Sequence, residues 1–260
     1  MLTEKSIFSR VELLLGQDFM DAISSKRVIL FGVGGVGSWC AEGLIRSGIR
    51  NLTIVDCDRV DVSNINRQLM ATTKTVGEVK VEALRNHLLE INPEANIEAV
   101  CKIFSEATAK DFALESFDYI IDAIDSLENK ARLILMASET QGVFFSSMGA
   151  ALKINPARVQ VAEFWKVKGC PLGRALRQRF KKLKQFPKHK FLCVFSDELL
   201  TNEGRETFLE TTKERKEMPD TCLNARSPKA QTNGSLVHIT GIFGFTLSGL
   251  VIEDIKRKIS

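Results

Sequence analysis

Residues 27–37, RVILFGVGGVG, decide the fold of this chain. Residues 28–31 are all apolar and end at a glycine, which predicts a short buried strand. The next residues satisfy the pattern GxGxxG, and a helix is predicted over residues 35–47. Such a turn lets the backbone approach a phosphate group, which then faces the amino end of the helix. The stretch therefore predicts a nucleotide-binding α/β fold. The glycines expected at the nucleotide are Gly32, Gly34, Gly35 and Gly37.

Predicted strands and helices alternate along the first 150 residues. The later strands are expected over residues 52–55, 96–100, 119–122 and 143–146. The other helices are expected over residues 4–25, 77–91, 106–114 and 126–140. Strands that alternate with helices in this way are typical of a parallel sheet. We therefore predict the α/β class, with a doubly wound, mainly parallel, Rossmann-like sheet.

The pattern changes after residue 150. Residues 152–154 and 159–161 flank the sequence Asn-Pro-Ala-Arg, which predicts an antiparallel hairpin. A basic helix, a further strand, a polar segment that we expect to be mobile and a final helix follow, over residues 172–186, 190–195, about 197–233 and 236–252. We expect a single domain over residues 1–260. Its parts are N-terminal helices (1–26), a nucleotide-binding core (27–150) and an antiparallel C-terminal extension with a basic, mobile insertion (151–260).

The composition is that of a folded, soluble protein, with 44% hydrophobic residues, 26% charged residues and a net charge of +4. None of the six cysteines belongs to a CxxC pair. We therefore expect a reducing, cytoplasmic location, no disulfide framework and no structural zinc. The N-terminus lacks the pattern of a signal peptide. Residues 236–252 are uncharged but contain polar residues and glycines, which favours a buried core helix over the alternative of a membrane anchor.

Polar side chains after the second predicted strand indicate which nucleotide the site binds. Asp56 ends this strand, 19 residues after Gly37, where a carboxylate can bind ribose hydroxyls, and Asp58 is expected in the same site. The stretch SNINRQ, residues 63–68, and Lys80 add amide and cationic groups at this edge. A dinucleotide has no terminal triphosphate that needs several cations, so this cluster favours ATP. The expected phosphate ligands are Asn64, Arg67 and Lys80. The alternative for both cations is a solvated loop or helix face.

A pair of acidic residues closes the fourth predicted strand. Asp122 is expected at the strand end, and Asp125 is expected over the phosphates, where a carboxylate can hold Mg²⁺. The alternative role for Asp125 is the N-cap of the next helix, and the two roles can coexist. Ser126 is also expected to contact the nucleotide.

Together these motifs resemble the ThiF/MoeB/HesA superfamily, which is similar to the adenylation domain of ubiquitin-activating enzymes. The resemblance covers roughly residues 6–165. It implies that Asp56 holds the ribose and that the cofactors are ATP and Mg²⁺, with the metal on Asp125. It also implies that Arg10 reaches the ATP of a partner subunit, which requires a homodimer with composite sites. The implied catalytic residues are Arg67, Lys80, Asp125 and Arg10.

Further stretches resemble one branch of this superfamily, the tRNA threonylcarbamoyladenosine dehydratases. These stretches are FSRVELLLG (8–16), DAIDS (122–126), INPARVQV (154–161), CVFSDE (193–198) and GSLVHITGIFGF (234–245). They imply ATP-dependent cyclisation of threonylcarbamoyladenosine at position 37 of tRNA through an acyl-adenylate, with sulfurtransferase-like proteins as possible partners. The first alternative is adenylation of the C-terminal glycine of a ubiquitin-like sulfur carrier. A non-catalytic nucleotide- or tRNA-binding module and a nicotinamide dehydrogenase are the others.

Residues 166–190 contain ten Lys or Arg and no Asp or Glu, which predicts a polyanionic partner. The side chains expected on the tRNA backbone are Arg174, Arg177, Lys181, Lys182 and Lys184. The alternative is a solvated helix face. We expect residues 146–150 to form a wall beside the modified base, and Cys222 to be a spectator thiol rather than a thioester nucleophile.

Overall fold

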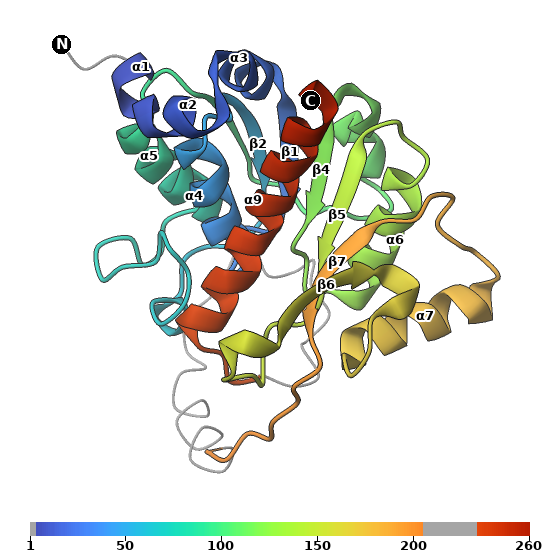
Figure 1. Ribbon diagram of the computed structural model, residues 1–260. Helices are drawn as coiled ribbons and strands as arrows, with labels where there is room; N and C mark the ends of the chain where they lie inside the picture. The colour runs from blue at the N-terminus through green and yellow to red at the C-terminus, as the bar shows by residue number, and fades with distance from the viewer. Residues whose placement is uncertain (1–3, 205–232) are drawn as a thin grey trace.

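A computed structural model describes residues 4–204 and 233–260 and contains one seven-stranded sheet in the order β3-β2-β1-β4-β5-β7-β6 (Figure 1). Each neighbouring pair is parallel except β6 and β7, which are antiparallel. The strands are β1 (Arg27–Phe31), β2 (Asn51–Val55), β3 (Asn96–Val100), β4 (Tyr119–Asp122), β5 (Val143–Ser147), β6 (Val159–Glu163) and β7 (Leu192–Ser196). The predicted doubly wound, mainly parallel α/β fold is confirmed.

Helices cover both faces of this sheet (Figure 1). One face carries α3 (Gln17–Ser25), α4 (Gly37–Arg46), α5 (Lys80–Ile91) and α9 (Val237–Ile259), and the other carries α6 (Leu127–Ala137) and α7 (Pro171–Leu183). The short helices α1 (Glu4–Ile7) and α2 (Ser9–Leu15) precede α3. The 3-10 helices are η1 (Val62–Asn64), η2 (Ala109–Phe112), η3 (Leu114–Ser116), η4 (Pro156–Arg158) and η5 (Phe164–Lys166).

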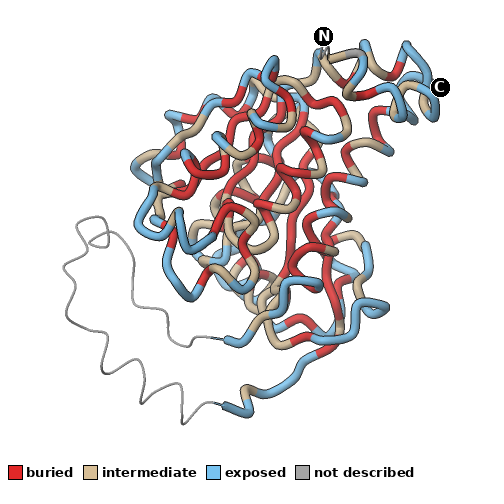
Figure 2. Tube along the Cα trace, turned by 90° about the vertical axis from the view of Figure 1, so that its left-hand side faces the viewer, coloured by how far each residue is buried: buried red, intermediate tan, exposed pale blue. Residues whose placement is uncertain are grey.

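The central strands are apolar on both faces because each face packs against a hydrophobic core. In β1, Val28 and Leu30 belong to the core under α4 and α9, whereas Ile29 and Phe31 belong to the core under α6 and α7. Figure 2 shows the buried residues concentrated in the middle of the molecule. Burial of a strand on both faces explains why period-two alternation is missing from this part of the sequence.

The C-terminal helix α9 is a core helix in this fold. It crosses α4 closely, since a Cβ atom on Gly244 would lie 2.5 Å from Val36 O and 2.8 Å from Cys40 N. Among the described residues α9 is the helix that is long and apolar enough to cross a membrane, but 56% of its apolar window is buried in the protein. The close crossing and this burial agree with the expected core helix.

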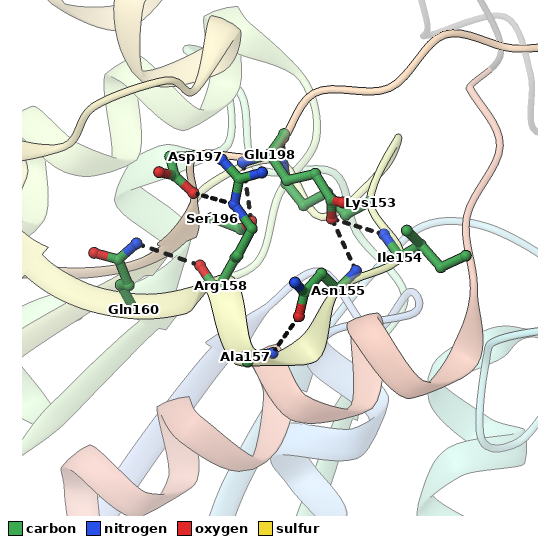
Figure 3. A network of polar contacts seen from close by, with 9 residues as sticks. All are labelled: Lys153, Ile154, Asn155, Ala157, Arg158, Gln160, Ser196, Asp197 and Glu198. Carbon is green, nitrogen blue, oxygen red and sulfur yellow. Dashed lines mark hydrogen bonds and ion pairs between the residues drawn. The ribbon is translucent and has the colours of Figure 1, made fainter.

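The expected hairpin after residue 150 is wrong. β6 pairs with β7, and residues 152–154 form no strand. Leu152 has a positive φ of 60°, and the backbone N–H groups of Ile154 and Asn155 both donate to Glu198 Oε2, at 2.8 and 2.9 Å (Figure 3). The donors that a hairpin ladder needs are therefore taken by a carboxylate more than 40 residues away.

Most predicted helices differ from the structure in their bounds, and backbone conformation explains three of these differences. The expected helix over residues 4–25 is split into three, and Gly16, with φ of 87°, separates the last two. The expected helix over 106–114 is replaced by η2 and η3, which are separated by Ala113 in the left-handed conformation. The helix α5 begins at Lys80 and not at Gly77, whose φ is 90°. Most of the segment expected to be mobile, residues 205–232 with Cys222, lies outside the described residues.

Candidate nucleotide-binding site

The glycine turn after β1 packs directly on the loop after β4. Gly32 has φ of 84°, and a Cβ atom there would lie 2.7 Å from Ala123 O. A Cβ atom on Gly37 would overlap Gly32 O, so both positions require glycine for packing. At Gly34 the nearest atom to an added Cβ is Gln68 Nε2, 3.8 Å away. Gly34 is therefore the glycine of this turn with room for a ligand to approach the backbone.

Asp56 lies next to the glycine turn at the end of β2. It is 9% exposed, and its Oδ2 accepts a hydrogen bond of 2.9 Å from the Val33 N–H. Its Oδ1 accepts from the Asp58 N–H, also at 2.9 Å. The structure thus gives Asp56 a role that sequence reasoning missed, because its carboxylate holds the turn against β2. The expected contact of Asp56 with ribose stays a prediction.

Asp58 and Lys80 form an ion pair at the same edge of the sheet. Lys80 Nζ lies 2.9 Å from Asp58 Oδ2, and only 7% of the lysine side chain is exposed. Lys80 is the first residue of α5, and its N–H donates to Asp58 O at 2.9 Å. The ammonium is thereby oriented at the amino end of a helix, a position that favours anions. Asp58 orients this lysine through both its carboxylate and its backbone carbonyl.

The stretch of residues 63–68 folds back on itself beside the glycine turn. The side chain of Asn64 accepts from the Asp61 N–H in a capping box at η1, and Asn64 is buried. The guanidinium of Arg67 donates to Ser63 O and to Asn66 Oδ1, both at 2.9 Å. These short-range bonds fix the loop that presents Arg67.

Arg67 lies where the turn, this loop and the loop after β4 come together. Its Cγ would be 3.3 Å from a Cβ atom on Gly35. Burial lowers the pKa of the Arg67 guanidinium from its ordinary value, and attraction to Asp125 and Asp61 opposes this effect. Arg67 therefore lies within electrostatic range of Asp125.

The helix-cap alternative for Asp125 is wrong. The N-cap of α6 is Ser126, and this residue makes no side-chain cap hydrogen bond. Asp125 therefore precedes the cap, and Ser126 occupies the helix entrance beside it. As a hard oxygen donor next to Arg67, the Asp125 carboxylate suits Mg²⁺.

A buried ion pair beneath this loop was missed by sequence reasoning. Lys130 Nζ lies 2.7 Å from Asp122 Oδ2 and donates to Ile124 O at 2.9 Å. Both charged side chains have no exposed surface. Asp122 also accepts from Ser146 Oγ at 2.7 Å and from the Ile124 N–H at 3.0 Å. The ion pair thus holds the loop that leads to Asp125, because Asp122 binds the backbone N–H of Ile124 and Lys130 binds its carbonyl oxygen. The sequence feature that could have indicated this pair was a lysine eight residues after an aspartate, in the helix that follows the strand.

Gln68 places a buried amide beside the open glycine. Its Nε2 is the atom nearest to the space over Gly34, and the residue is 6% exposed. Among the described atoms its Oε1 has no hydrogen-bond partner. A buried acceptor without a partner carries a penalty that a donor on a ligand can relieve.

Arg10 does not join this cluster within one chain. It is exposed on α2, which lies toward the amino ends of the strands, whereas the glycine turn lies at their carboxyl ends (Figure 1). The neighbouring apolar side chains Leu13 and Leu14 are 78% and 80% exposed. The expected contact of Arg10 with a partner's ATP stays a prediction.

A second polar cluster fixes the chain between the core and its C-terminal part (Figure 3). Glu198 accepts from two backbone N–H groups, which lowers the pKa of its carboxyl, and its carbonyl accepts from Lys153 Nζ. Burial lowers the pKa of the Lys153 ammonium. The guanidinium of Arg158 lies 2.8 Å from Asp197, and a hydrogen bond from this group lowers the pKa of the Asp197 carboxyl. The cluster is a structural junction at the carboxyl end of β7.

The basic helix α7 begins beside the expected wall of the site. A Cβ atom on Gly173 would lie 3.4 Å from Met148 Sδ. Residues 146–148 are buried and residues 149 and 150 are partly exposed, and their expected contact with the modified base stays a prediction. Arg177 donates to Phe164 O at 3.1 Å and lies over the Phe164 ring, so this predicted tRNA contact has a structural role. The other predicted contacts on this helix are exposed: Arg174, Lys181, Lys182 and Lys184.

Comparisons with known proteins agree with this geometry. The chain is 32% identical to the tRNA threonylcarbamoyladenosine dehydratase of Bacillus subtilis (strain 168) over 252 residues, which cover 97% of this chain and 95% of the relative. The structure is similar to that of the E. coli enzyme TcdA in complex with ATP, with a TM-score of 0.82, 27% identity and coverage of 100% and 98%. Its complex with AMP gives a TM-score of 0.83 at the same identity and coverage. The ThiF family matches residues 8–190. Because this match covers most of the chain, the chain belongs to the ThiF family.

Proposed function

We propose that this protein is an ATP-dependent dehydratase that cyclises threonylcarbamoyladenosine at position 37 of tRNA. The observation that supports the proposal is the contact of Arg67 with the glycine turn beside the Lys80–Asp58 ion pair, in a chain that aligns over 97% of its length with a relative of that name. A relative solved with ATP and with AMP supports nucleotidyl transfer over hydride transfer.

The reaction has two balanced steps. In the first, the carboxylate of the threonylcarbamoyl side chain attacks the α-phosphorus of ATP, and pyrophosphate leaves as the acyl-adenylate forms. In the second, the carbamoyl group of the same side chain attacks the activated acyl carbon and AMP leaves. The modified nucleoside loses one water overall, and the chain supplies no covalent nucleophile. The protein therefore acts by positioning and by electrostatic stabilisation.

The side chains divide this task by their chemistry. The ammonium of Lys80, already oriented by Asp58, offers a compact charge to phosphate oxygens. The guanidinium of Arg67 offers a fork of donors for the charge that develops on the phosphates. The backbone at Gly34 is open to close approach, and Asp56 would hold the ribose.

Mg²⁺ fits this donor set. Asp125 would hold the ion together with phosphate oxygens, because carboxylate and phosphate oxygens are the ligands that Mg²⁺ prefers. When bound, the ion would neutralise charge on the phosphates. The proximity of Asp125 to Arg67 supports a phosphate between them.

A homodimer would complete the site. Exposed Leu13 and Leu14 next to Arg10 form an apolar surface that a second copy can bury, and the same contact would carry Arg10 toward the partner's ATP. Mixed dimers of R10A and K80A chains test this. Since one of their two sites then carries both changes and the other neither, activity above that of either parent is expected. No recovery after subunit exchange, shown by tagged chains, would count against a composite site.

The function itself is tested by incubation with ATP, Mg²⁺ and tRNA that carries threonylcarbamoyladenosine. The nucleosides are then analysed by mass spectrometry, and the loss of one water together with release of AMP is expected. Pyrophosphate exchange measured with the same tRNA and with a ubiquitin-like sulfur carrier distinguishes this function from adenylation of a carrier protein. Stimulation by the carrier and not by tRNA would replace the proposal with carrier-protein adenylation.

A further inference from the structure

An exposed aromatic pair lies near the end of the basic helix α7. The ring centroids of Trp165 and Phe186 are 6.1 Å apart, and their planes are tilted by 46°. Trp165 is 39% exposed and Phe186 is 52% exposed. The two rings come from η5 and from the segment after α7, so separate parts of the chain bring them together. Large rings usually lie in the core, and a pair exposed together is a candidate contact surface.

The Trp165 ring packs against a cluster of buried aromatic side chains. Phe164 is fully buried, and its ring contacts Trp165 edge-on with centroids 5.1 Å apart. Phe164 is itself packed against Phe180 at 5.8 Å and stacked on Phe191 at 5.1 Å. The backbone N–H of Trp165 donates to Glu163 Oε2 at 3.2 Å, which fixes the main chain beneath the ring. A ring supported in this way presents a pre-organised surface, which reduces the entropy lost on binding.

The chain segment that joins Trp165 to Phe186 and continues to residue 190 is cationic. Of the ten cations in residues 166–190, Arg177 contacts Phe164, and Arg179 and Lys188 form ion pairs with Glu128 and Glu139. The remaining seven are exposed and form no ion pair with any described residue. These seven are Lys166, Lys168, Arg174, Lys181, Lys182, Lys184 and Lys190. Exposed aromatic rings in a segment whose cations are not paired with described carboxylates match a polyanion whose units carry flat, stackable bases.

We propose that Trp165 and Phe186 form a stacking platform for an unpaired base of the RNA substrate, while the cations around them contact the neighbouring phosphates. This inference rests on the proposed function, which makes tRNA the substrate. α7 begins beside Met148 at the candidate site, and its 13 residues span about 20 Å. The platform thus lies roughly one helix length from the modified nucleoside. Unpaired nucleotides of the same loop suit it, because proteins recognise single-stranded RNA by stacking bases on aromatic side chains.

Tryptophan fluorescence tests the contact directly. The chain contains two tryptophans, so a W39F variant leaves Trp165 as the only reporter. This variant is titrated, without ATP, with an anticodon stem-loop and with a blunt RNA duplex of equal charge. Quenching by the stem-loop and little change with the duplex are expected. Equal quenching by both RNAs, or quenching by neither, would overturn the platform.

Steady-state kinetics distinguish base stacking from non-specific hydrophobic contact. F186L keeps an apolar side chain but removes the ring, and L183A is the matched control because Leu183 is 49% exposed at the end of the same helix. F186L is expected to raise the KM for tRNA roughly 5- to 100-fold, with kcat and thermal midpoint unchanged. L183A is expected to change KM less than about twofold. An equal rise in both variants, or none in F186L, contradicts the proposal.

The two levels of inference can fail separately. If the wild-type protein binds the stem-loop with quenching but never yields the cyclised nucleoside, the proposed function fails and the platform stands. If the wild-type protein and F186L cyclise tRNA with the same KM, the platform fails and the proposed function stands.

Discussion

Replacement of Lys130 by methionine is expected to destabilise the protein and to disturb the ATP site. Lys130 and Asp122 have no exposed surface, and their charged atoms are 2.7 Å apart. Methionine keeps most of the side-chain volume but leaves the Asp122 carboxylate buried without its counter-charge. Loss of one partner of a buried ion pair costs about 3–5 kcal/mol in free energy of unfolding.

The lower end of that range is the better expectation for K130M. Asp122 keeps two hydrogen bonds, from Ser146 Oγ and from the Ile124 N–H. A loss of about 3 kcal/mol lowers the melting temperature of a chain of this size by roughly 6–12 °C. Differential scanning calorimetry of the ligand-free protein measures this change.

A double-mutant cycle isolates the pair. D122N leaves Lys130 buried without a carboxylate, so it should also destabilise by about 3 kcal/mol or more. In the double variant neither charge remains, and the total loss is expected to be smaller than the sum of the single losses by at least about 2 kcal/mol. Single losses that add to within about 0.5 kcal/mol would refute the coupling.

The K130M variant also tests whether the buried ion pair supports the ATP site. Because Lys130 also binds Ile124 O, the residue before Asp125, K130M should weaken ATP binding even well below its melting temperature. Calorimetric titration with ATP in the presence of Mg²⁺ measures this. An unchanged Kd would show that the ion pair supports the core alone and does not position the loop.

Three further predictions use other parts of the structure. G32A should fail to fold or melt far lower, by calorimetry, since its Cβ atom would lie 2.7 Å from Ala123 O at a φ of 84°. K80A should abolish ATP–pyrophosphate exchange while the dimer still folds, and exchange at the wild-type rate would remove Lys80 from the mechanism. The hydrogen bond to Glu42 raises the pKa of His87 above its ordinary 6.5, so this pair stabilises the folded state below that value and progressively less as pH rises above it. Urea unfolding should show that H87Q lowers the free energy of unfolding most at acidic pH. A decrease that is independent of pH would contradict the assignment.

The sequence predicted best those features that neighbouring residues determine. The strand and turn over residues 27–37 were recognisable because an apolar run and a glycine pattern are both local. Arg67 and Asp125 were placed at one edge because the carboxyl ends of parallel strands meet there. The class of fold and the edge that carries the site therefore followed from short patterns.

Side-chain pairs across long sequence separations could not be predicted in this way. Asp58 and Lys80 were both expected to bind the nucleotide, but which side chain lies against the ammonium depends on how β2 meets α5. The hairpin failed for the same reason, because Glu198 takes the backbone donors of Ile154 and Asn155. Pattern reasoning assigns roles to residues one at a time, whereas the folded chain satisfies buried groups in pairs.

The C-terminal part of the chain takes part in forming the nucleotide edge. Asn66, within the stretch of residues 63–68, donates to Ser235 O at 2.9 Å, and Thr240 on α9 would lie 3.1 Å from a Cβ atom on Gly35. The Leu152 N–H donates to Gly234 O at 2.9 Å, which joins the same segment to the junction around Glu198. The loop that presents Arg67 is therefore supported from residues more than 160 positions later. This support explains why motifs confined to the first half of the chain describe the ligands of the site but not how they are held in place.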